Sequence, residues 1–425
     1  MSRDYIETGV EWINSIPSNW KLLKVKNCFY ISKKKAQAKN PTILKLARDA
    51  VKVRDISTNE GQIAASYDDY NPVFPGDFLL NPMDLYSGAN CNVSEVEGVI
   101  SPAYINLRKT RELNPKYFDY YFKAQYWTMA MFAHGKGVSF DNRWTINVEG
   151  MKNYEIPFPN IDEQNKIVAV INKKCSQIDE LIAIQEQEIE KLKAYKQSLI
   201  TEIVTKGLDH NAEMKESGVD RIGKTPSTNE VIKLKYITTI SRGLFNHRPR
   251  NDPRYYDGTH PFVQTGDVAR AGKYINTYSQ TLNDLGTSVS KKFPKGTMTM
   301  TIAANIGDIA ILNFDAYFPD SVLGCSPKKG FDQNYIYYVF CSLKEEFLKC
   351  SVVSTQLNLN VDRVKNIEIS VTRDILKQKM IADYLDQKSS LIDHLVKVKQ
   401  FKIIKLNDYR KSLIYEYVTG KKEIM

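Results

Sequence analysis

The chain has 425 residues, of which 42% are hydrophobic and 25% are charged, and its net charge is +10. These values are ordinary for a globular protein, and the length suggests two or three domains, each able to bury its own core. No run approaches eighteen apolar residues, the first residues lack the apolar core of a signal peptide, and the six cysteines form no C-x-x-C pair. These features argue against a membrane span and favour a reducing, cytoplasmic environment.

Short strand-like runs, broken by Pro/Gly turns, occur in both halves of the chain. Each set is followed by an aromatic helical segment, which begins at Tyr117 in the first half and at Tyr335 in the second. Because tyrosines recur in these segments at helical spacing, they indicate core packing rather than base stacking. The pattern predicts two domains of mixed α and β structure, with strands in Thr42–Val53, Phe78–Asn81, Val99–Leu107, Phe262–Thr265, Thr297–Ile302 and Ile309–Phe314.

A heptad repeat follows the first of these domains. Apolar residues at alternating steps of three and four predict one helix over Asp162–Gly207, with acids in its first turn and glycine at its end. At 1.5 Å per residue this helix would be roughly 65 Å long. A helix of that length needs a partner helix along its apolar seam.

The partner lies in the same chain, because the helix recurs 214 residues later (409 − 195, from Tyr409 and Tyr195) as Asp374–Gly420. The short segments that precede each domain and each helix recur as well, which makes this an internal repeat. The order predicts an α+β fold with domains over residues 1–160 and 209–373 and helices in 161–208 and 374–425. A long heptad helix could also serve homodimerisation or form a stalk, but the high local concentration of the second helix favours pairing of the two helices with each other. Antiparallel pairing would give an internal pseudo-two-fold axis and place the two domains at opposite ends.

The predicted seam of the helix pair is apolar with two polar interruptions. Gln185 corresponds to Lys399, and Lys196 to Arg410, so these positions are candidates for setting the register. The apolar seam residues are Ile171, Ile178, Ile182, Ile189, Leu192, Leu199, Leu385, Ile392, Val396, Ile403, Leu406 and Leu413.

No catalytic constellation stands out. The five histidines and six cysteines have no metal-ligand spacing. The segment Gly218–Thr225 fits the pattern G-x-x-x-x-G-K-[ST], but polar residues precede it and a Pro-containing turn follows, where a phosphate loop needs a strand and a helix. An NTP-binding enzyme that uses this segment therefore remains only as an alternative.

Basic and polar residues in loops are the better candidates for function. Arginine in a loop can contact phosphates or read guanine edges, and a net positive charge favours a polyanion, although either feature is also compatible with a solvated surface. The candidate DNA-binding residues are Lys33, Lys34, Lys35, Lys136, Ser139, Arg143, Arg242, Asn246, His247, Arg248, Arg250 and Gln356.

The pattern resembles the specificity subunit of a Type I restriction-modification enzyme. The resemblance covers nearly the whole chain and depends on motifs that occur in a fixed order in the two halves. They are Ile16-Pro17-Ser18, Glu155-Ile156-Pro157, Asp162-Glu163-Gln164, Ile178-Asp179, Ser198-Leu199-Ile200, Thr225-Pro226-Ser227 and Pro261-Phe262-Val263-Gln264-Thr265-Gly266-Asp267-Val268. The second copy departs from this pattern at Ser370–Thr372 and at Lys377-Gln378, where a proline and an acid are lost.

The resemblance implies two target-recognition domains, each reading one half of a bipartite sequence in double-stranded DNA, and helices that set the spacer. It also implies that this chain is not an enzyme and binds no cofactor. Two methyltransferase subunits would use S-adenosylmethionine, and translocase-nuclease subunits would use ATP and magnesium. The alternative from another class is a structural coiled-coil scaffold that makes no contact with DNA.

Overall fold

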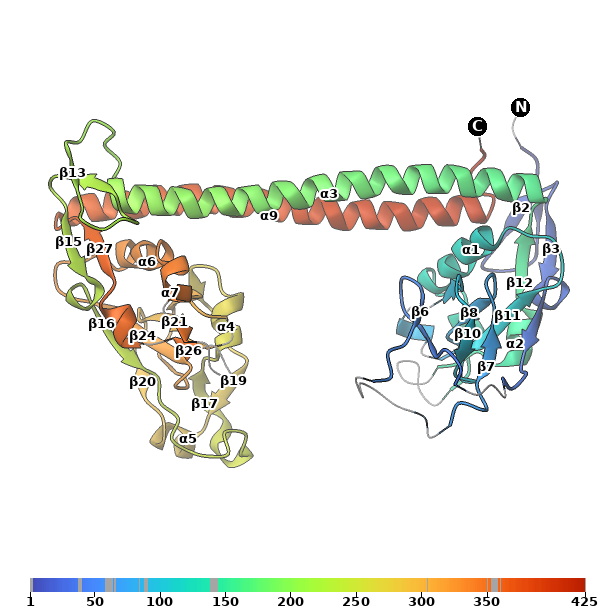
Figure 1. Ribbon diagram of the computed structural model, residues 1–425, viewed down its shortest axis with the longest axis horizontal. Helices are drawn as coiled ribbons and strands as arrows, with labels where there is room; N and C mark the ends of the chain where they lie inside the picture. The colour runs from blue at the N-terminus through green and yellow to red at the C-terminus, as the bar shows by residue number, and fades with distance from the viewer. Residues whose placement is uncertain are drawn as a thin grey trace. The chain divides into compact units, whose positions relative to one another are not determined.

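The structure is a computed structural model, and it describes residues 3–36, 40–57, 64, 66–83, 85–87, 91–137, 144–303, 305–349, 351–352, 358–359 and 361–424. The chain forms two structural units, which we call unit 1 (residues 1–185 and 400–425) and unit 2 (residues 186–399). Each unit contains one mixed α/β domain together with about half of each long helix (Figure 1).

The two long helices are α3 (Ile161–Lys206) and α9 (Ile375–Val418), so the prediction of two long helices is confirmed to within a few residues at each end. Asn160 Oδ1 accepts the Glu163 amide at the start of α3, and Asp374 Oδ1 accepts the Leu376 amide at the start of α9. Both helices end at a glycine with positive φ, which a residue with a side chain adopts only with strain.

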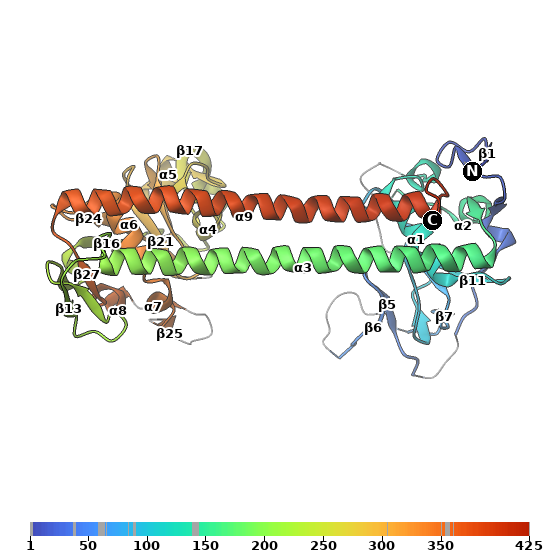
Figure 2. The same cartoon turned by 90° about the horizontal axis from the view of Figure 1, so that it is seen from above.

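Within each unit the two helices lie side by side and run in opposite directions (Figure 2). In unit 2, Lys196 forms an ion pair with Asp393 at 2.7 Å, and Lys399 with Glu188 at 2.5 Å. In unit 1, Arg410 pairs with Asp179. As the residue number rises along α3, the partner's number falls along α9, which is the register of an antiparallel pair.

The domain of unit 1 is built on a four-stranded antiparallel sheet in the order β4-β11-β8-β9. Helix α1 packs on this sheet, and Tyr117, Phe118, Tyr121 and Phe122 are all buried there, which confirms the core interpretation of the first aromatic segment. The elements of this unit are β1 (Tyr5–Glu7), β2 (Ser15–Pro17), β3 (Lys21–Lys24), β4 (Phe29–Ser32), β5 (Leu44–Leu46), β6 (Val51–Val53), β7 (Asn71–Val73), β8 (Phe78–Leu80), β9 (Cys91–Val93), β10 (Gly98–Ile100), β11 (Ile105–Lys109), α1 (Pro115–Trp127), α2 (Val148–Asn153) and β12 (Glu155–Phe158).

The domain of unit 2 contains the corresponding antiparallel strands in the order β16-β24-β21-β22, extended by β18, and a second sheet in the order β19-β17-β23-β20. Tyr335 and Tyr338 of α6 are buried against the first sheet, as predicted. The elements are β13 (Met214–Glu216), β14 (Lys224–Pro226), β15 (Glu230–Lys233), β16 (Thr238–Arg242), β17 (Tyr256–Phe262), α4 (Thr265–Arg270), β18 (Tyr274–Ile275), β19 (Gln280–Leu282), α5 (Asp284–Ser288), β20 (Lys292–Phe293), β21 (Met298–Thr301), β22 (Ile309–Leu312), β23 (Ala316–Tyr317), β24 (Val322–Pro327), α6 (Gln333–Cys341), α7 (Lys344–Lys349), β25 (Ser351–Val352), β26 (Asn358–Leu359), α8 (Val361–Lys365) and β27 (Glu368–Val371).

Three predicted strands have different bounds. The run Thr42–Val53 forms two strands, β5 and β6, because the chain reverses where the Ala47 amide bonds the Ala50 carbonyl. The run Val99–Leu107 is divided by a turn between β10 and β11, which belong to different sheets. The run Phe262–Thr265 coincides with the end of β17 and the start of α4, where Asp267 Oδ2 accepts the Gln264 amide. Turns formed by residues other than Gly or Pro account for the first of these errors.

Within the described residues, no helix has both the length and the apolar character needed to cross a membrane.

Candidate nucleic-acid interface

The basic segment of unit 2 begins at the end of β16, an outer strand of the first sheet. Arg242 is the last residue of this strand, pairs with Leu323 of β24 and is exposed. The backbone of the next residue, Gly243, passes so close to the segment around Pro319 that a Cβ there would lie 2.2 Å from the Pro319 carbonyl oxygen. The Gly243 amide donates to the Val322 carbonyl at 2.9 Å. A glycine is therefore required for the segment to follow this path.

Phe245 anchors the segment in a small core of its own. Its ring is buried and packs with Phe262 and Leu282, and it stacks on Tyr256 with ring centroids 5.7 Å apart. The amide of the following residue, Asn246, donates to the Val289 carbonyl at 3.0 Å, and its side chain is exposed. The buried Phe245 ring therefore holds Asn246 at the surface and sets the position of the basic residues that follow it.

His247 is bound within the loop. Its Nε2 lies 3.0 Å from Asp252 Oδ2, and its ring stacks on Tyr255 with centroids 4.0 Å apart. Asp252 also accepts from the Arg254 guanidinium at 2.7 Å, and this hydrogen bond holds the pKa of the Asp252 carboxyl well below its usual value. His247 therefore stabilises the conformation of the loop.

Arg248 and Arg250 lie at the tip of the segment, each about half exposed, and both are near Asp320. The structure thus brings five predicted residues of unit 2 into one continuous surface segment, comprising Arg242, Asn246, His247, Arg248 and Arg250. Gln356, the remaining candidate of this unit, lies outside the described residues.

In unit 1 the candidate lysines follow β4, which occupies in its sheet the place that β16 occupies in unit 2. Lys33, Lys34 and Lys35 are exposed, and Lys35 forms an ion pair with Asp69 at 2.5 Å. Lys136 is also exposed, and its backbone bridges to Thr145. Ser139 and Arg143 lie outside the described residues.

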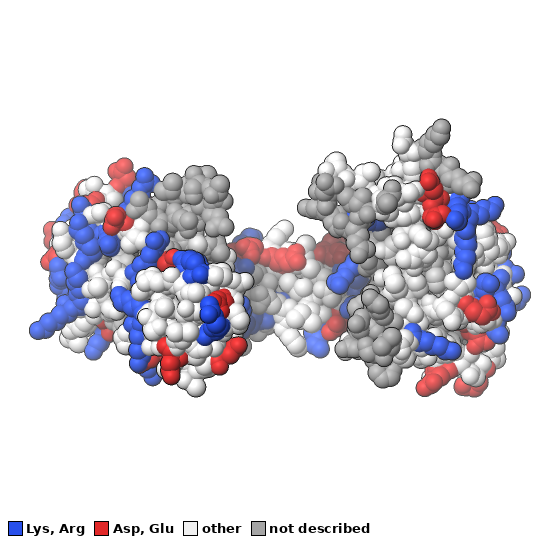
Figure 3. Space-filling view, turned by 90° about the horizontal axis from the view of Figure 1, so that it is seen from below, with Lys and Arg blue, Asp and Glu red and all other residues white. Residues whose placement is uncertain are grey.

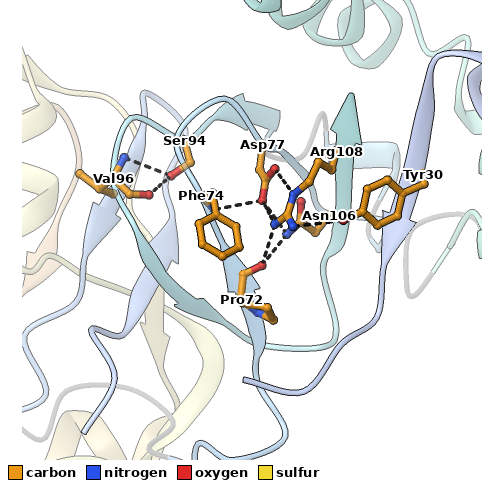
Figure 4. A network of polar contacts seen from close by, with 8 residues as sticks. All are labelled: Tyr30, Pro72, Phe74, Asp77, Ser94, Val96, Asn106 and Arg108. Carbon is orange, nitrogen blue, oxygen red and sulfur yellow. Dashed lines mark hydrogen bonds and ion pairs between the residues drawn. The ribbon is translucent and has the colours of Figure 1, made fainter. Parts of the chain in front are cut away.

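A polar network missed by the sequence analysis joins β11 to β4, the strand that precedes the lysines of unit 1 (Figure 4). The Arg108 guanidinium donates to both carboxylate oxygens of Asp77, at 2.8 and 2.6 Å, and to the Tyr30 hydroxyl at 3.1 Å. Asn106 Nδ2 also donates to Asp77, at 3.2 Å, and Arg108 lies 4.4 Å from the centroid of the Phe74 ring. Asp77 is buried and orients the Arg108 guanidinium. The bond from Arg108 to Tyr30 then joins β11 to β4, the strand that precedes Lys33–Lys35.

Two residues of unit 2 were also missed. Lys291 Nζ donates to Ser241 Oγ at 2.7 Å, which adds a cation on the strand that ends at Arg242, and Asp320 faces the two arginines of the tip. Both lie far along the chain from the segment they contact. Figure 3 shows Lys and Arg side chains in several clusters on one face of each unit, with acidic side chains between them.

The predicted seam residues are buried or half-buried in the structure. The buried ones are Ile171, Ile178, Ile189, Leu385, Ile392 and Leu413, and the half-buried ones are Ile182, Leu192, Leu199, Val396, Ile403 and Leu406. Of the polar interruptions, Gln185 is buried, and Lys196, Lys399 and Arg410 form the ion pairs between the helices.

A pair of equivalent glutamines joins each domain to its long helix. Gln164 of α3 accepts the Asn114 amide at 2.8 Å and donates to the Pro159 carbonyl at 2.9 Å. Gln378 of α9 accepts the Asp332 amide at 2.7 Å in the same way. Asn114 and Asp332 are the N-cap residues of α1 and α6, so each glutamine connects a domain helix to a long helix at the same place in the repeat.

The segment Gly218–Thr225 does not have the form of a phosphate-binding loop. It connects β13 to β14 in an antiparallel hairpin, and Lys224 belongs to the second strand, where a phosphate loop would begin a helix. Within the part of the chain that the structure describes, no group of three or more His, Cys, Asp or Glu side chains could hold a metal ion.

Comparisons with known proteins agree with this geometry. Residues 226–406 match the family model of the Type I restriction modification DNA specificity domain. The chain is 29% identical over 188 residues to the Type I restriction enzyme MjaIX specificity subunit of Methanocaldococcus jannaschii. The similarity covers 43% of this chain and 42% of that protein, which is less than half of the relative's length.

Two solved structures are similar over almost the whole chain. One belongs to a study of complex assembly and conformational transition of the type I R-M system, with a TM-score of 0.67, 15% identity, and coverage of 96% of this chain and 99% of that chain. The HsdS subunit from Thermoanaerobacter tengcongensis has a TM-score of 0.50 and 13% identity, with coverage of 96% and 98%. At these identities the likeness establishes a shared fold. The domain match and the curated relative thus agree with the resemblance found in the sequence, and the two solved structures show that the chain shares their fold.

Proposed function

We propose that this chain is the sequence-specific DNA-binding subunit of a Type I restriction-modification complex. Each mixed α/β domain is a target-recognition domain that reads one half of a bipartite, asymmetric DNA site. The long helices set the spacer between the half-sites and dock two methyltransferase subunits.

The observation that carries this proposal is the shared construction of the two domains. Both contain four antiparallel strands in the same order, and in both a basic segment follows the outer strand, β4 or β16. The basic segments differ in sequence, with Lys33–Lys35 in one and Arg242–Arg250 in the other. Equivalent position supports a common role in DNA contact, and different side chains support different half-sites.

The helices support the spacer and docking roles. Ion pairs and a buried seam fix their register, as a spacer requires. Away from the seam both helices expose apolar side chains, among them Leu181 and Ile184 of α3 and Phe401 and Ile404 of α9. Exposed apolar residues at this density on a helix surface are typical of a protein interface.

We further propose that the chain recognises the DNA sequence and does not itself catalyse a reaction. In this proposal methylation uses S-adenosylmethionine on the methyltransferase subunits, and DNA translocation and cleavage use ATP and magnesium on the endonuclease subunits. The chain itself then needs to bind only double-stranded DNA and its protein partners.

The test is an exchange of residues 27–145 for the equivalent domain of another family member. We expect the map of methylated adenines in host DNA to show one changed half-site and one unchanged half-site. A change in both, or in neither, would contradict the modular proposal.

A scaffold without DNA contact predicts a different result in a direct binding assay. If the logarithm of the binding constant for duplex DNA falls linearly with the logarithm of the salt concentration, the chain contacts DNA phosphates, since each neutralised phosphate contributes about 0.9 to the slope. This result supports the DNA-binding proposal. A chain that does not bind duplex DNA at low salt supports the scaffold.

A further inference from the structure

Asp320 places one carboxylate between the two arginines at the tip of the basic segment of unit 2. Its Oδ1 lies 2.5 Å from an Arg250 nitrogen, and its Oδ2 lies 3.5 Å from an Arg248 nitrogen. The three side chains are between 34% and 53% exposed, so the cluster is open to solvent and to a ligand. Its formal charge is +1, from two guanidinium groups and one carboxylate.

The position of Asp320 is set by backbone contacts. Gly243 packs against the Pro319 carbonyl, and the Leu244 amide donates to the Phe318 carbonyl at 3.0 Å. The turn that contains Asp320 is closed by a bond from the Val322 amide to the Pro319 carbonyl, also at 3.0 Å. The basic segment and the acidic turn are therefore tied together at their bases.

The two arginines are held differently. Arg248 donates through Nη1 to the carbonyls of Phe245 and His247, at 2.6 and 2.8 Å, which orients its other nitrogen toward Asp320. The Arg250 guanidinium donates a hydrogen bond to Asp320 Oδ1 and forms an ion pair with it. Arg242 is exposed at the base of the segment and has no ion-pair partner in the described ranges.

A DNA phosphodiester has the charge of a carboxylate and also offers two oxygens to arginine. We propose that Asp320 is a phosphate mimic that occupies the phosphate position between Arg248 and Arg250 until DNA replaces it. By neutralising one of the two positive charges, Asp320 removes one phosphate contact that DNA of any sequence would offer, and so lowers the non-specific affinity of the chain for DNA. This inference rests on the proposed DNA-binding function.

The test compares the full chain with its Asp320→Asn variant on a random-sequence DNA duplex over a range of salt concentrations. One additional phosphate neutralised makes the slope of log K against log salt steeper by about 0.9. If affinity in about 1 M salt is unchanged, this slope corresponds to about eightfold tighter non-specific binding at about 0.1 M salt.

Two further variants keep the test specific. Glu230→Gln removes a carboxylate from an ion pair with Arg373 in which both side chains are about half exposed, on β15 outside the basic segment, and we expect it to leave the slope unchanged. Arg250→Gln should abolish most of the gain produced by Asp320→Asn when the two are combined, because one of the released charges is then absent. Thermal melting of each variant establishes that it is folded.

The outcomes separate this inference from the proposed function. A wild-type chain that binds duplex DNA, with an Asp320→Asn variant of equal or lower affinity, overturns the role of Asp320 alone. An equal gain from Glu230→Gln overturns it too, because any lost negative charge would then have the same effect. A folded wild-type chain that does not bind duplex DNA at low salt overturns DNA binding itself.

Discussion

The junction between domain and long helix can be tested at Gln164, whose side chain is completely buried. Gln164→Leu keeps the volume of the side chain but removes its acceptor and its donor. The Asn114 amide and the Pro159 carbonyl, now bonded at 2.8 and 2.9 Å, would lose these partners. An unpaired buried polar group costs about 1–3 kcal/mol, so two such groups lower the free energy of unfolding by about 2–6 kcal/mol, less a small gain from the apolar leucine.

Urea unfolding measures this loss, and hydrogen exchange locates it. Because Asn114 caps α1, we expect faster exchange in α1 and the start of α3, with unit 2 unaffected. The matched control is Gln177→Leu, the same substitution at an exposed position of the same helix in the same unit. A Gln164→Leu variant within about 1 kcal/mol of this control would refute the reasoning.

Three further predictions concern the helix pair and the first core. Lys196→Glu places a like charge against Asp393 and should lower the free energy of unfolding by about 1 kcal/mol. Adding Asp393→Lys should restore this loss, and urea unfolding of the two single variants and the double variant measures the coupling energy. A coupling energy of zero would show that the ion pair does not contribute to stability. Burial raises the pKa of the Cys28 thiol from 9.0 to about 11, so its contribution to stability is complete below about pH 9 and is lost as the pH rises toward 11. Thermal melting across this range should show a smaller alkaline loss for Cys28→Ala than for wild type, and an equal loss would contradict the assignment. One helical turn added near Gln185 and near Lys399 should lengthen the DNA spacer by about two base pairs, from 5.4 Å per turn against about 3.4 Å per base pair, and a methylation map with the original spacer would contradict the proposal that the helices set the spacer.

The elements that sequence analysis predicted best are those with a long-range pattern in the sequence. The heptad repeat over α3 and its recurrence over α9 required only side-chain type and spacing, and the structure contains both helices. The two domains share a sheet order that their sequences do not reveal, because different apolar residues can fill equivalent core positions.

The polar partners were not predictable in the same way. Asp320 lies 72 residues from Arg248, and Asp77 lies 31 residues from Arg108, so no local pattern connects the members of either pair. The lysines and arginines were found because they cluster along the chain, but whether each one is free or neutralised depends on strand pairing. Gly243 shows the same limit, since its close approach to Pro319 exists only in the folded sheet.

The core of the first domain has a consequence for protein synthesis. Leu413, Ile414, Tyr417 and Val418, near the end of the chain, belong to the same buried cluster as Tyr117 and Phe118. The Tyr117 hydroxyl donates to the Val418 carbonyl at 2.8 Å, across 301 residues of sequence. On the ribosome, the core of this domain therefore cannot close before residues 413–418 have been synthesised, which is after the whole of unit 2. The domain of unit 1 thus completes its folding after unit 2 has been made, which departs from the usual order in which domains fold one after another from the N-terminus.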